Sequence, residues 1–449
     1  MYYITFLQAI GIIGGRNMIS KIICKTLFTG EDIQNNKCVI IEDGKIKEVV
    51  DDLADININD GNENYECNFL MPGLIDAHVH ITGYSEKYLG TNPYKYVENF
   101  IKILVSRGIT SVRDMGNSIE AVEYAKKWGE VNYNIDIVYS GPILDSIPLT
   151  WASSRIISGE DDIDLTISKL KQEGVDFIKV YKNITLQYLK EITKCATKKG
   201  LKVAIDSPYI PTELQIEEGV YSIEHISNLF ANYAKRNQIE NVVLGLNDKE
   251  YINKIIEILK KYGTYCCPTL LTVERLLNPD LMLKDDSIDF MIPIMPYHKY
   301  IKQMQNKIGG FLGKKYMYDA LGIDEKQLKK YRIEDVIQKL EKLLVKLVDN
   351  DINILIGTDS PNPTITPGFS LHKEMELWNR AGVPEIDILR TVTSKNSVVI
   401  NDTVGFIKKD MKANLLLLNS NPLRNINNIQ DIKGVFVAGK FVDNIDIKL

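Results

Sequence analysis

The chain of 449 residues lacks the sequence features that assign proteins to several common functional classes. Its net charge is only −5, and no long block of one sign is present, which argues against binding to nucleic acid or to a membrane surface. No Gly-x-Gly-x-x-Gly follows an expected strand, no Gly-x-Ser-x-Gly occurs, and residues 309–315 miss the spacing of a phosphate-binding loop. The sequence therefore shows no sign of a dinucleotide-binding loop or a serine hydrolase.

Cysteine is scarce, with six residues and no Cys-x-x-Cys pair. A chain of this length builds a sizeable core without disulfides, so we expect reduced thiols and a cytoplasmic protein. Long hydrophobic runs are also missing. Residues 1–17 are apolar but too short to cross a bilayer, and they lack a basic start and a small-residue cleavage site. We expect them to form a partly disordered N-terminal overhang, and we expect no membrane partner.

Histidine is rare as well, and two of the five histidines stand in one tripeptide. His78 and His80 close the sequence Met-Pro-Gly-Leu-Ile-Asp-Ala-His-Val-His at residues 71–80. Residues i and i+2 of a strand point to the same face, so the two imidazoles would project side by side. Neutral imidazole is a strong ligand for zinc and similar ions. The motif therefore predicts part of a divalent metal site, and a solvated pair of surface histidines at a turn is the alternative.

Short strands occupy both ends of the chain. Residues 39–49 read as a hairpin with Asp43-Gly44 at its turn, and residues 413–418 and 435–442 follow similar patterns. Two all-β ends around an alternating middle predict one composite β-sandwich domain, built from residues 18–67 and 402–449.

The middle of the chain, residues 68–401, alternates strands with helices. The eight expected strands are residues 68–76, 109–115, 136–142, 175–182, 201–207, 220–226, 264–270 and 353–359. This count predicts an α/β fold with a closed parallel (β/α)8 barrel. Residues 271–350 are too long for one connection and are expected to form a partly helical insertion over one barrel end. Tyr297-His298 in this insertion could reach a site, with a solvated histidine as the alternative.

The ten-residue histidine motif resembles the first-strand signature of the amidohydrolase superfamily, which comprises metal-dependent hydrolases built on a (β/α)8 barrel. Residues 222–225 (Ser-Ile-Glu-His) and 357–360 (Gly-Thr-Asp-Ser) resemble the sixth- and eighth-strand signatures of that family. The resemblance implies that His225 binds a second metal ion. It also implies that Asp359 touches the first ion and takes a proton from water. An aspartate that caps the turn before Pro361 is the alternative.

Lys179 stands among apolar neighbours in residues 176–181, Asp-Phe-Ile-Lys-Val-Tyr. Burial would favour its neutral amine, which can capture carbon dioxide as a carbamate. The segment resembles the strand that carries the carboxylated lysine in prolidase-like and imidazolonepropionase-related amidohydrolases. That resemblance implies a carbamate bridging two metal ions. A lysine that extends from the strand end into solvent is the alternative.

The fifth strand departs from the family pattern, which places a metal-binding histidine in a Val-Ala-x-His sequence. Here residues 203–206 read Val-Ala-Ile-Asp, so Asp206 occupies the ligand position. A carboxylate can bind zinc, and the second site would then consist of the Lys179 carbamate, Asp206 and His225. A carboxylate also moves the preference toward manganese or magnesium. A second ion that is weakly bound or absent is the alternative.

Three further residues are candidates for supporting the site or contacting substrate. Asp76 precedes His78 by two residues and is expected to orient a ligand imidazole. Tyr181 follows the lysine strand, and His372 lies in a segment that resembles the family helix after the last strand. A purely structural role is the alternative for His372.

The resemblance implies a metal-dependent amidohydrolase with one or two divalent ions, Zn²⁺ first among them. Its substrate would be a small amide, either dipeptide-like or an N-acyl amino acid, cleaved by water activated at the metal. Hydrolysis of a cyclic amide or deamination of a heterocycle is one alternative. A non-catalytic relative that binds a ligand is another, because Asp206 replaces the histidine. The resemblance also implies a homo-oligomer.

Overall fold

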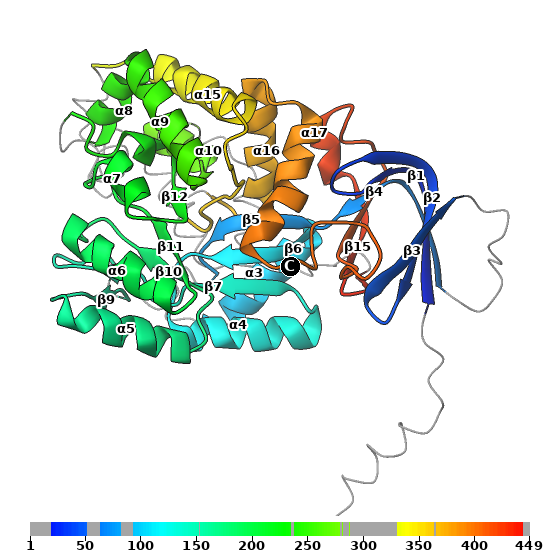
Figure 1. The fold of residues 1–449 in the computed structure, drawn as a ribbon. Coiled ribbons are helices and arrows are strands. Elements are labelled where there is room, and N and C mark those ends of the chain that lie inside the picture. Colours follow the sequence, from blue (N-terminus) through cyan, green and yellow to red (C-terminus); the bar gives the residue numbers. More distant parts are fainter. Residues whose placement is uncertain are drawn as a thin grey trace, which may run out of the picture.

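The computed structural model describes residues 19–51, 63–81, 93–151, 153–234, 238–278, 281, 287, 330–362 and 365–442. The expected overhang over residues 1–17 and the candidate Tyr297-His298 lie outside these residues. The described chain forms a small sheet on one side and a larger assembly of parallel strands and helices on the other (Figure 1). Over these ranges no helix combines the length and the apolar character needed to cross a membrane.

The small β domain joins both ends of the chain in one seven-stranded sheet, with the order β16-β15-β14-β4-β1-β2-β3. Strands β1 and β2 are antiparallel, and Asp43-Gly44 forms the predicted turn between β2 and β3. The strands are β1 (Ile19–Phe28), β2 (Ile33–Glu42), β3 (Lys45–Asp51), β4 (Glu63–Pro72), β14 (Leu415–Leu418), β15 (Ile432–Val437) and β16 (Lys440–Val442).

This sheet differs from the predicted sandwich, because its strands are hydrogen-bonded into a single sheet rather than two. Ile46 of β3 and Leu415 of β14 nevertheless share one buried hydrophobic cluster. The sheet therefore bends around its own core and needs no second sheet to cover it.

Two parallel sheets make up the larger assembly, with the orders β5-β6-β7 and β13-β12-β11-β10-β8-β9. Backbone contacts connect the two sheets. Asp176 donates its N–H to the Tyr139 carbonyl, Cys266 forms a bridge with Ile354, and Val79 forms one with Ser360. The segment 353–360 thus stands between β13 and β5, an arrangement consistent with the barrel of amidohydrolases. The strands are β5 (Leu74–Val79), β6 (Ile109–Asp114), β7 (Asp136–Tyr139), β8 (Leu144–Asp145), β9 (Arg155–Ile156), β10 (Phe177–Val180), β11 (Lys202–Ile205), β12 (Ser222–Glu224) and β13 (Tyr265–Cys267).

Amphipathic helices cover the outer side of the parallel strands (Figure 1). In α15, Val336, Leu340, Leu344 and Leu347 recur at helical spacing and are buried, so one apolar stripe faces the core. The α-helices are α3 (Pro93–Ser106), α4 (Ile119–Asn132), α5 (Asp161–Gln172), α6 (Leu186–Lys198), α7 (Thr212–Glu217), α8 (Gln238–Asn247), α9 (Lys249–Tyr262), α10 (Leu270–Leu277), α15 (Ile333–Asp349), α16 (Phe369–Ala381) and α17 (Glu385–Arg390). The short turns are η2 (Ile226–Phe230), η4 (Thr391–Lys395), η5 (Asn396–Val399) and η6 (Ile426–Gln430).

Gly73 marks the passage from the small domain into the parallel sheets. The predicted strand over residues 68–76 is split there, since β4 ends at Pro72 and β5 begins at Leu74. A Cβ atom at residue 73 would lie 2.3 Å from Thr110 Oγ1, so only glycine allows this close approach to β6. The break fixes the start of β5 at Leu74, so His78 and His80 lie at the carboxyl end of this strand.

Candidate metal centre

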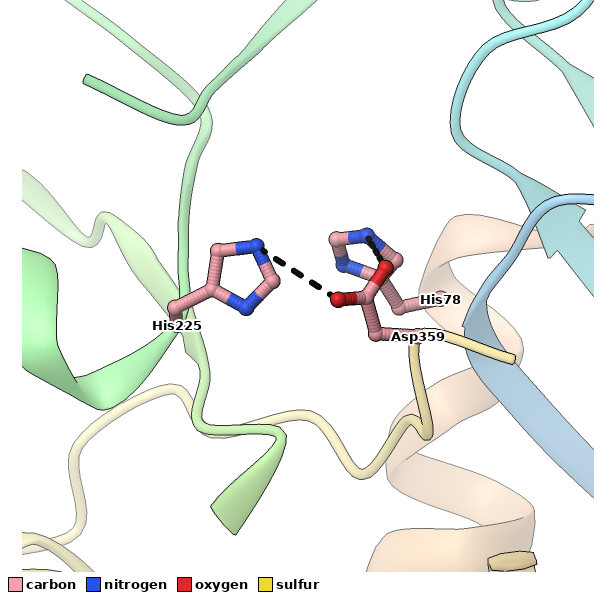
Figure 2. Close-up of side chains that lie close together, drawn as sticks. All are labelled: His78, His225 and Asp359. Carbon is pink, nitrogen blue, oxygen red and sulfur yellow. Dashed lines mark ion pairs between the residues drawn. The ribbon is translucent and has the colours of Figure 1, made fainter. Parts of the chain in front are cut away.

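His78, His225 and Asp359 come together at the carboxyl ends of the parallel strands, as Figure 2 shows. One ligand atom from each lies within 4.8 Å of the others. His78 Nε2 and His80 Nε2 are each 3.3 Å from Asp359 Oδ1, and His225 Nε2 is 4.0 Å from Asp359 Oδ2. Residues far apart in sequence thus form one cluster where barrel enzymes place their catalytic groups.

The three imidazoles share one arrangement: Nδ1 is engaged by a supporting group, and Nε2 faces the Asp359 carboxylate. The Nδ1 partners are Glu224 Oε2 for His78 (2.8 Å), the Gly116 carbonyl for His80 (3.2 Å) and Thr269 Oγ1 for His225 (2.6 Å). Histidines that bind metals generally use one ring nitrogen in this way, because the second contact fixes the tautomer and the orientation of the ring. The cluster is therefore built like a metal centre.

The charges in the cluster also suit a cation. Burial acts to raise the pKa of Asp359, but the charges and hydrogen bonds of the neighbouring histidines hold that pKa well below its usual range. Burial lowers the pKa of His78, and nearby Lys179 lowers it further. The carboxylates act in the opposite sense on the other two rings: although burial lowers both pKa values, Asp359 raises the pKa of His80 and Asp206 that of His225. The cluster thus offers an ionised carboxylate to a cation, and His78 is the imidazole whose surroundings favour the neutral form that binds metals.

Asp206 follows β11 and lies beside His225, with 3.3 Å between Asp206 Oδ2 and His225 Nε2. Its Oδ1 accepts a hydrogen bond from the Asn228 amide at 2.8 Å. Burial acts to raise the pKa of Asp206, but the charge and hydrogen bond of His225 outweigh it and hold the pKa at about 2. An ionised carboxylate therefore lies at the position where the resemblance of the fifth strand implies a ligand.

Lys179 on β10 is only 2% exposed, and its Nζ has no hydrogen-bond partner among the residues described. The amine is close enough to Asp206 and His225 to affect the pKa of each. A buried polar group without a partner is costly, so the side chain needs a modification or a ligand to satisfy it. This orphaned amine, whose charge affects the pKa values of His78, His225, Asp206 and Glu224, fits the predicted carbamate and a bound divalent ion.

Asp76 acts on the backbone rather than on a ring. Its carboxylate accepts hydrogen bonds from the N–H groups of His78 (3.2 Å) and Thr358 (3.0 Å) and from the Thr358 hydroxyl (2.8 Å). We expected Asp76 to orient a ligand imidazole, but in the structure Glu224 contacts the His78 ring. The short Asp76 side chain contacts its own strand at His78 and the neighbouring segment at Thr358, and thereby joins β5 to residues 357–360.

The remaining two candidates lie in different places. The Tyr181 side chain is half-buried, and burial raises the pKa of its hydroxyl well above the usual value, with the charges of Asp206 and Asp359 raising it further. It therefore stays protonated close to the cluster. His372 Nε2 lies 2.9 Å from the Arg107 carbonyl, two residues before β6 begins. Leu74, the first residue of β5, pairs with the first residue of β6, so His372 lies at the strand end opposite to the cluster.

Sequence reasoning missed several supporting residues. Glu224 stood inside the sixth-strand motif, and Arg113 was a charged residue within an apolar strand, which is a signal of a buried ion pair. Thr269 gave no signal. Thr269, His225 and Asp359 all have positive φ, at 43°, 68° and 65°, and such backbone strain is typical of functional sites.

The fold and the cluster define a barrel-type α/β protein with a candidate metal centre of histidine and aspartate. Residues 69–264 match the model of the amidohydrolase family, which confirms the resemblance seen in the sequence. The structure is similar to a Xaa-Pro dipeptidase with bound methionine in the active site (TM-score 0.67, 16% identity, covering 95% of this chain and 100% of that chain). It is also similar to a prolidase complexed with N-methylphosphonate-L-proline (0.66, 17%, 95% and 100%) and to the ochratoxinase of A. niger (0.66, 16%, 95% and 96%). At these identities the likeness concerns the fold, and no curated protein matches the sequence.

Proposed function

We propose that this protein is a metal-dependent amidohydrolase that cleaves a small amide, either dipeptide-like or an N-acyl amino acid. The observation that carries the proposal is the shared orientation of three imidazoles, each with its Nε2 toward Asp359. The fold of the Xaa-Pro dipeptidase and of the prolidase supports the choice of substrate class.

A first divalent ion, Zn²⁺ being the favoured one, would be held by His78, His80 and Asp359. A second ion would be held by the Lys179 carbamate, Asp206 and His225. Bound there, such an ion lowers the pKa of water and polarises an amide carbonyl. Asp359 is the proton carrier of this proposal. Its carboxylate accepts a proton from the attacking water and donates it to the departing amine as the C–N bond breaks.

Tyr181 has a role toward substrate in the same scheme. Its hydroxyl is a donor that stays protonated beside two carboxylates, so it can hydrogen-bond an oxygen of the substrate. A ligand-binding relative without catalysis is the second candidate function, and Asp206 is the observation that favours it. The aspartate replaces the histidine of the family pattern, so the second metal position has one neutral ligand fewer. A chain that binds no ion and hydrolyses no amide would be a ligand-binding relative without catalysis.

One experiment separates these functions. The purified protein is loaded with Zn²⁺ or Mn²⁺, its metal content is measured, and it is assayed against Xaa-Pro and other dipeptides, N-acyl amino acids and cyclic amides. We expect bound metal and hydrolysis of at least one linear amide. The Asp359→Asn variant serves as the control for contaminating peptidases. Bound metal with hydrolysis only of cyclic amides would move the proposal to the cyclic class, and absence of both metal and hydrolysis would refute it.

A further inference from the structure

Arg113 is the largest charged side chain enclosed within the described part of the parallel sheets, with an exposure of 2%. It extends from β6 toward two other strands. Its Nε donates to the Ala77 carbonyl on β5 at 2.6 Å, and its Nη1 donates to Ser222 Oγ on β12 at 3.2 Å. Its Nη2 donates to Glu224 Oε1 at 2.9 Å and to Oε2 at 3.1 Å. The guanidinium thus connects the strands that carry His78 and His225.

Glu224 carries this connection to the candidate metal centre. Oε1 also accepts the Ser222 hydroxyl at 2.6 Å, and Oε2 lies 2.8 Å from His78 Nδ1. A carboxylate is only an acceptor, so it places the hydrogen of the His78 ring on Nδ1. The Nε2 lone pair of His78 then points to the side where Asp359 lies, 3.3 Å away. One continuous chain of contacts therefore runs from Arg113 through Glu224 to a candidate ligand atom.

We propose that Arg113 is a positioning residue of the metal centre, acting through Glu224 to fix the orientation and tautomer of His78. This inference rests on the proposed function, since it requires that His78 bind a metal ion. Two features of the geometry support it. The Nε and Nη1 atoms anchor the guanidinium to Ala77 and Ser222 while Nη2 contacts both oxygens of Glu224, a combination that the single ammonium of a lysine cannot reproduce. Glu224 is fully buried, so without Arg113 its charge would lack its cationic partner and the His78 contact would no longer be fixed.

The test uses Co²⁺, whose visible absorption reports the geometry of its ligands. Co²⁺ affinity and the absorption spectrum are measured for the wild-type chain and for Arg113→Met. Loss of a group that supports a metal ligand typically weakens metal binding about 10- to 100-fold. We expect a loss in this range together with a changed spectrum. The matched control is Arg380→Met, which removes an arginine paired with Glu274 and Glu341 on the outer side of α16. Its affinity and spectrum should equal those of the wild type.

A second variant keeps the inference testable if the uncompensated Glu224 charge prevents folding. Arg113→Met/Glu224→Gln removes both buried charges and restores electrical balance. It should fold and still bind Co²⁺ more weakly than the wild type, with a changed spectrum. Wild-type affinity and spectrum in either variant would overturn the positioning role while leaving the proposed function intact. A wild-type chain that binds no metal would overturn both.

Discussion

The two ends of strand β5 use histidine in opposite ways. At the carboxyl end, His78 and His80 have Nδ1 engaged by supporting groups and direct Nε2 at the Asp359 carboxylate. Near the amino end, the His372 Nε2–H donates to the backbone carbonyl of Arg107. One end thus keeps ring nitrogens oriented toward a shared point, and the other uses the ring to complete a backbone hydrogen bond.

Backbone geometry separates the two ends by residue type. At the amino end, Asn134 and Asp351 have positive φ just before strand segments, and asparagine and aspartate tolerate this conformation well. Thr269 at the cluster also has positive φ, which is unusual for a β-branched residue. Such a residue persists only where the surrounding structure holds it, which is typical of a functional site. Substitutions of matched residue types at the two ends can test this difference.

Replacing Lys179 should have the largest effect on the metal content of the protein. Lys179→Ala removes the orphaned amine that the proposed carbamate needs, so the purified protein should retain no second ion and lose most of the first. Metal analysis after gel filtration measures this. The control is Lys202→Ala, because Lys202 begins the next strand at the opposite end and is exposed. Normal metal content in Lys179→Ala would falsify the carbamate assignment.

Asp359→Asn keeps the shape of the side chain but removes the proton acceptor. General acid–base groups contribute about 10²- to 10⁴-fold, so kcat/KM for the best amide substrate should fall about 10³-fold at saturating metal. Asp136→Asn is the matched change at the start of β7, where Asp136 pairs with Lys412. That control should keep wild-type kcat/KM. A small loss in Asp359→Asn would assign the proton transfer to another group.

Much of the fold and of the candidate metal centre could be predicted from the sequence. The expected strand at 109–115 is β6, and α15 supplies part of the helix expected within residues 271–350, because apolar periodicity specifies elements of this kind. His78, His225 and Asp359 were recognised because each stands at or near the end of an expected strand segment, in a motif of specific residue types. The roles of Asp76 and Glu224 could not be predicted in this way. Both are carboxylates on strands, and only the packing of neighbouring strands decides which of them reaches an imidazole.

The pH dependence of stability should distinguish His372 from the histidines of the cluster. Burial lowers the pKa of His372 from 6.5 to about 4. Between these values the unfolded chain binds a proton that the folded chain does not, so His372 stabilises the fold above pH 6.5 and this stability is lost as the pH falls toward 4. The loss between pH 7.5 and pH 5 is about 2 kcal/mol.

Urea unfolding at these two pH values measures the difference. His372→Gln keeps a donor for the Arg107 carbonyl and does not titrate, so its free energy of unfolding should fall by about 2 kcal/mol less than that of the wild type. Its metal content and activity should stay normal. An equal pH dependence in both proteins would show that His372 titrates alike in the folded and unfolded chain.

Asp206→His should have the smallest effect on metal binding. It tests whether Asp206 is a ligand at the second position of the cluster. Asp206 lies beside His225 on one side and Asn228 on the other, at the position where the resemblance implies a ligand imidazole. Restoring the imidazole should tighten Zn²⁺ at the second position about tenfold, which corresponds to about 1.4 kcal/mol. Equilibrium dialysis against Zn²⁺ and Mn²⁺ measures this, with Asp206→Asn as the control that loses the charge and should bind both ions more weakly. Because Mn²⁺ prefers oxygen ligands, the histidine variant should gain affinity for Zn²⁺ and lose it for Mn²⁺. If neither variant changes the affinity for either ion, Asp206 is not a ligand, and the metal centre consists of one ion beside a carboxylate that serves only to orient His225.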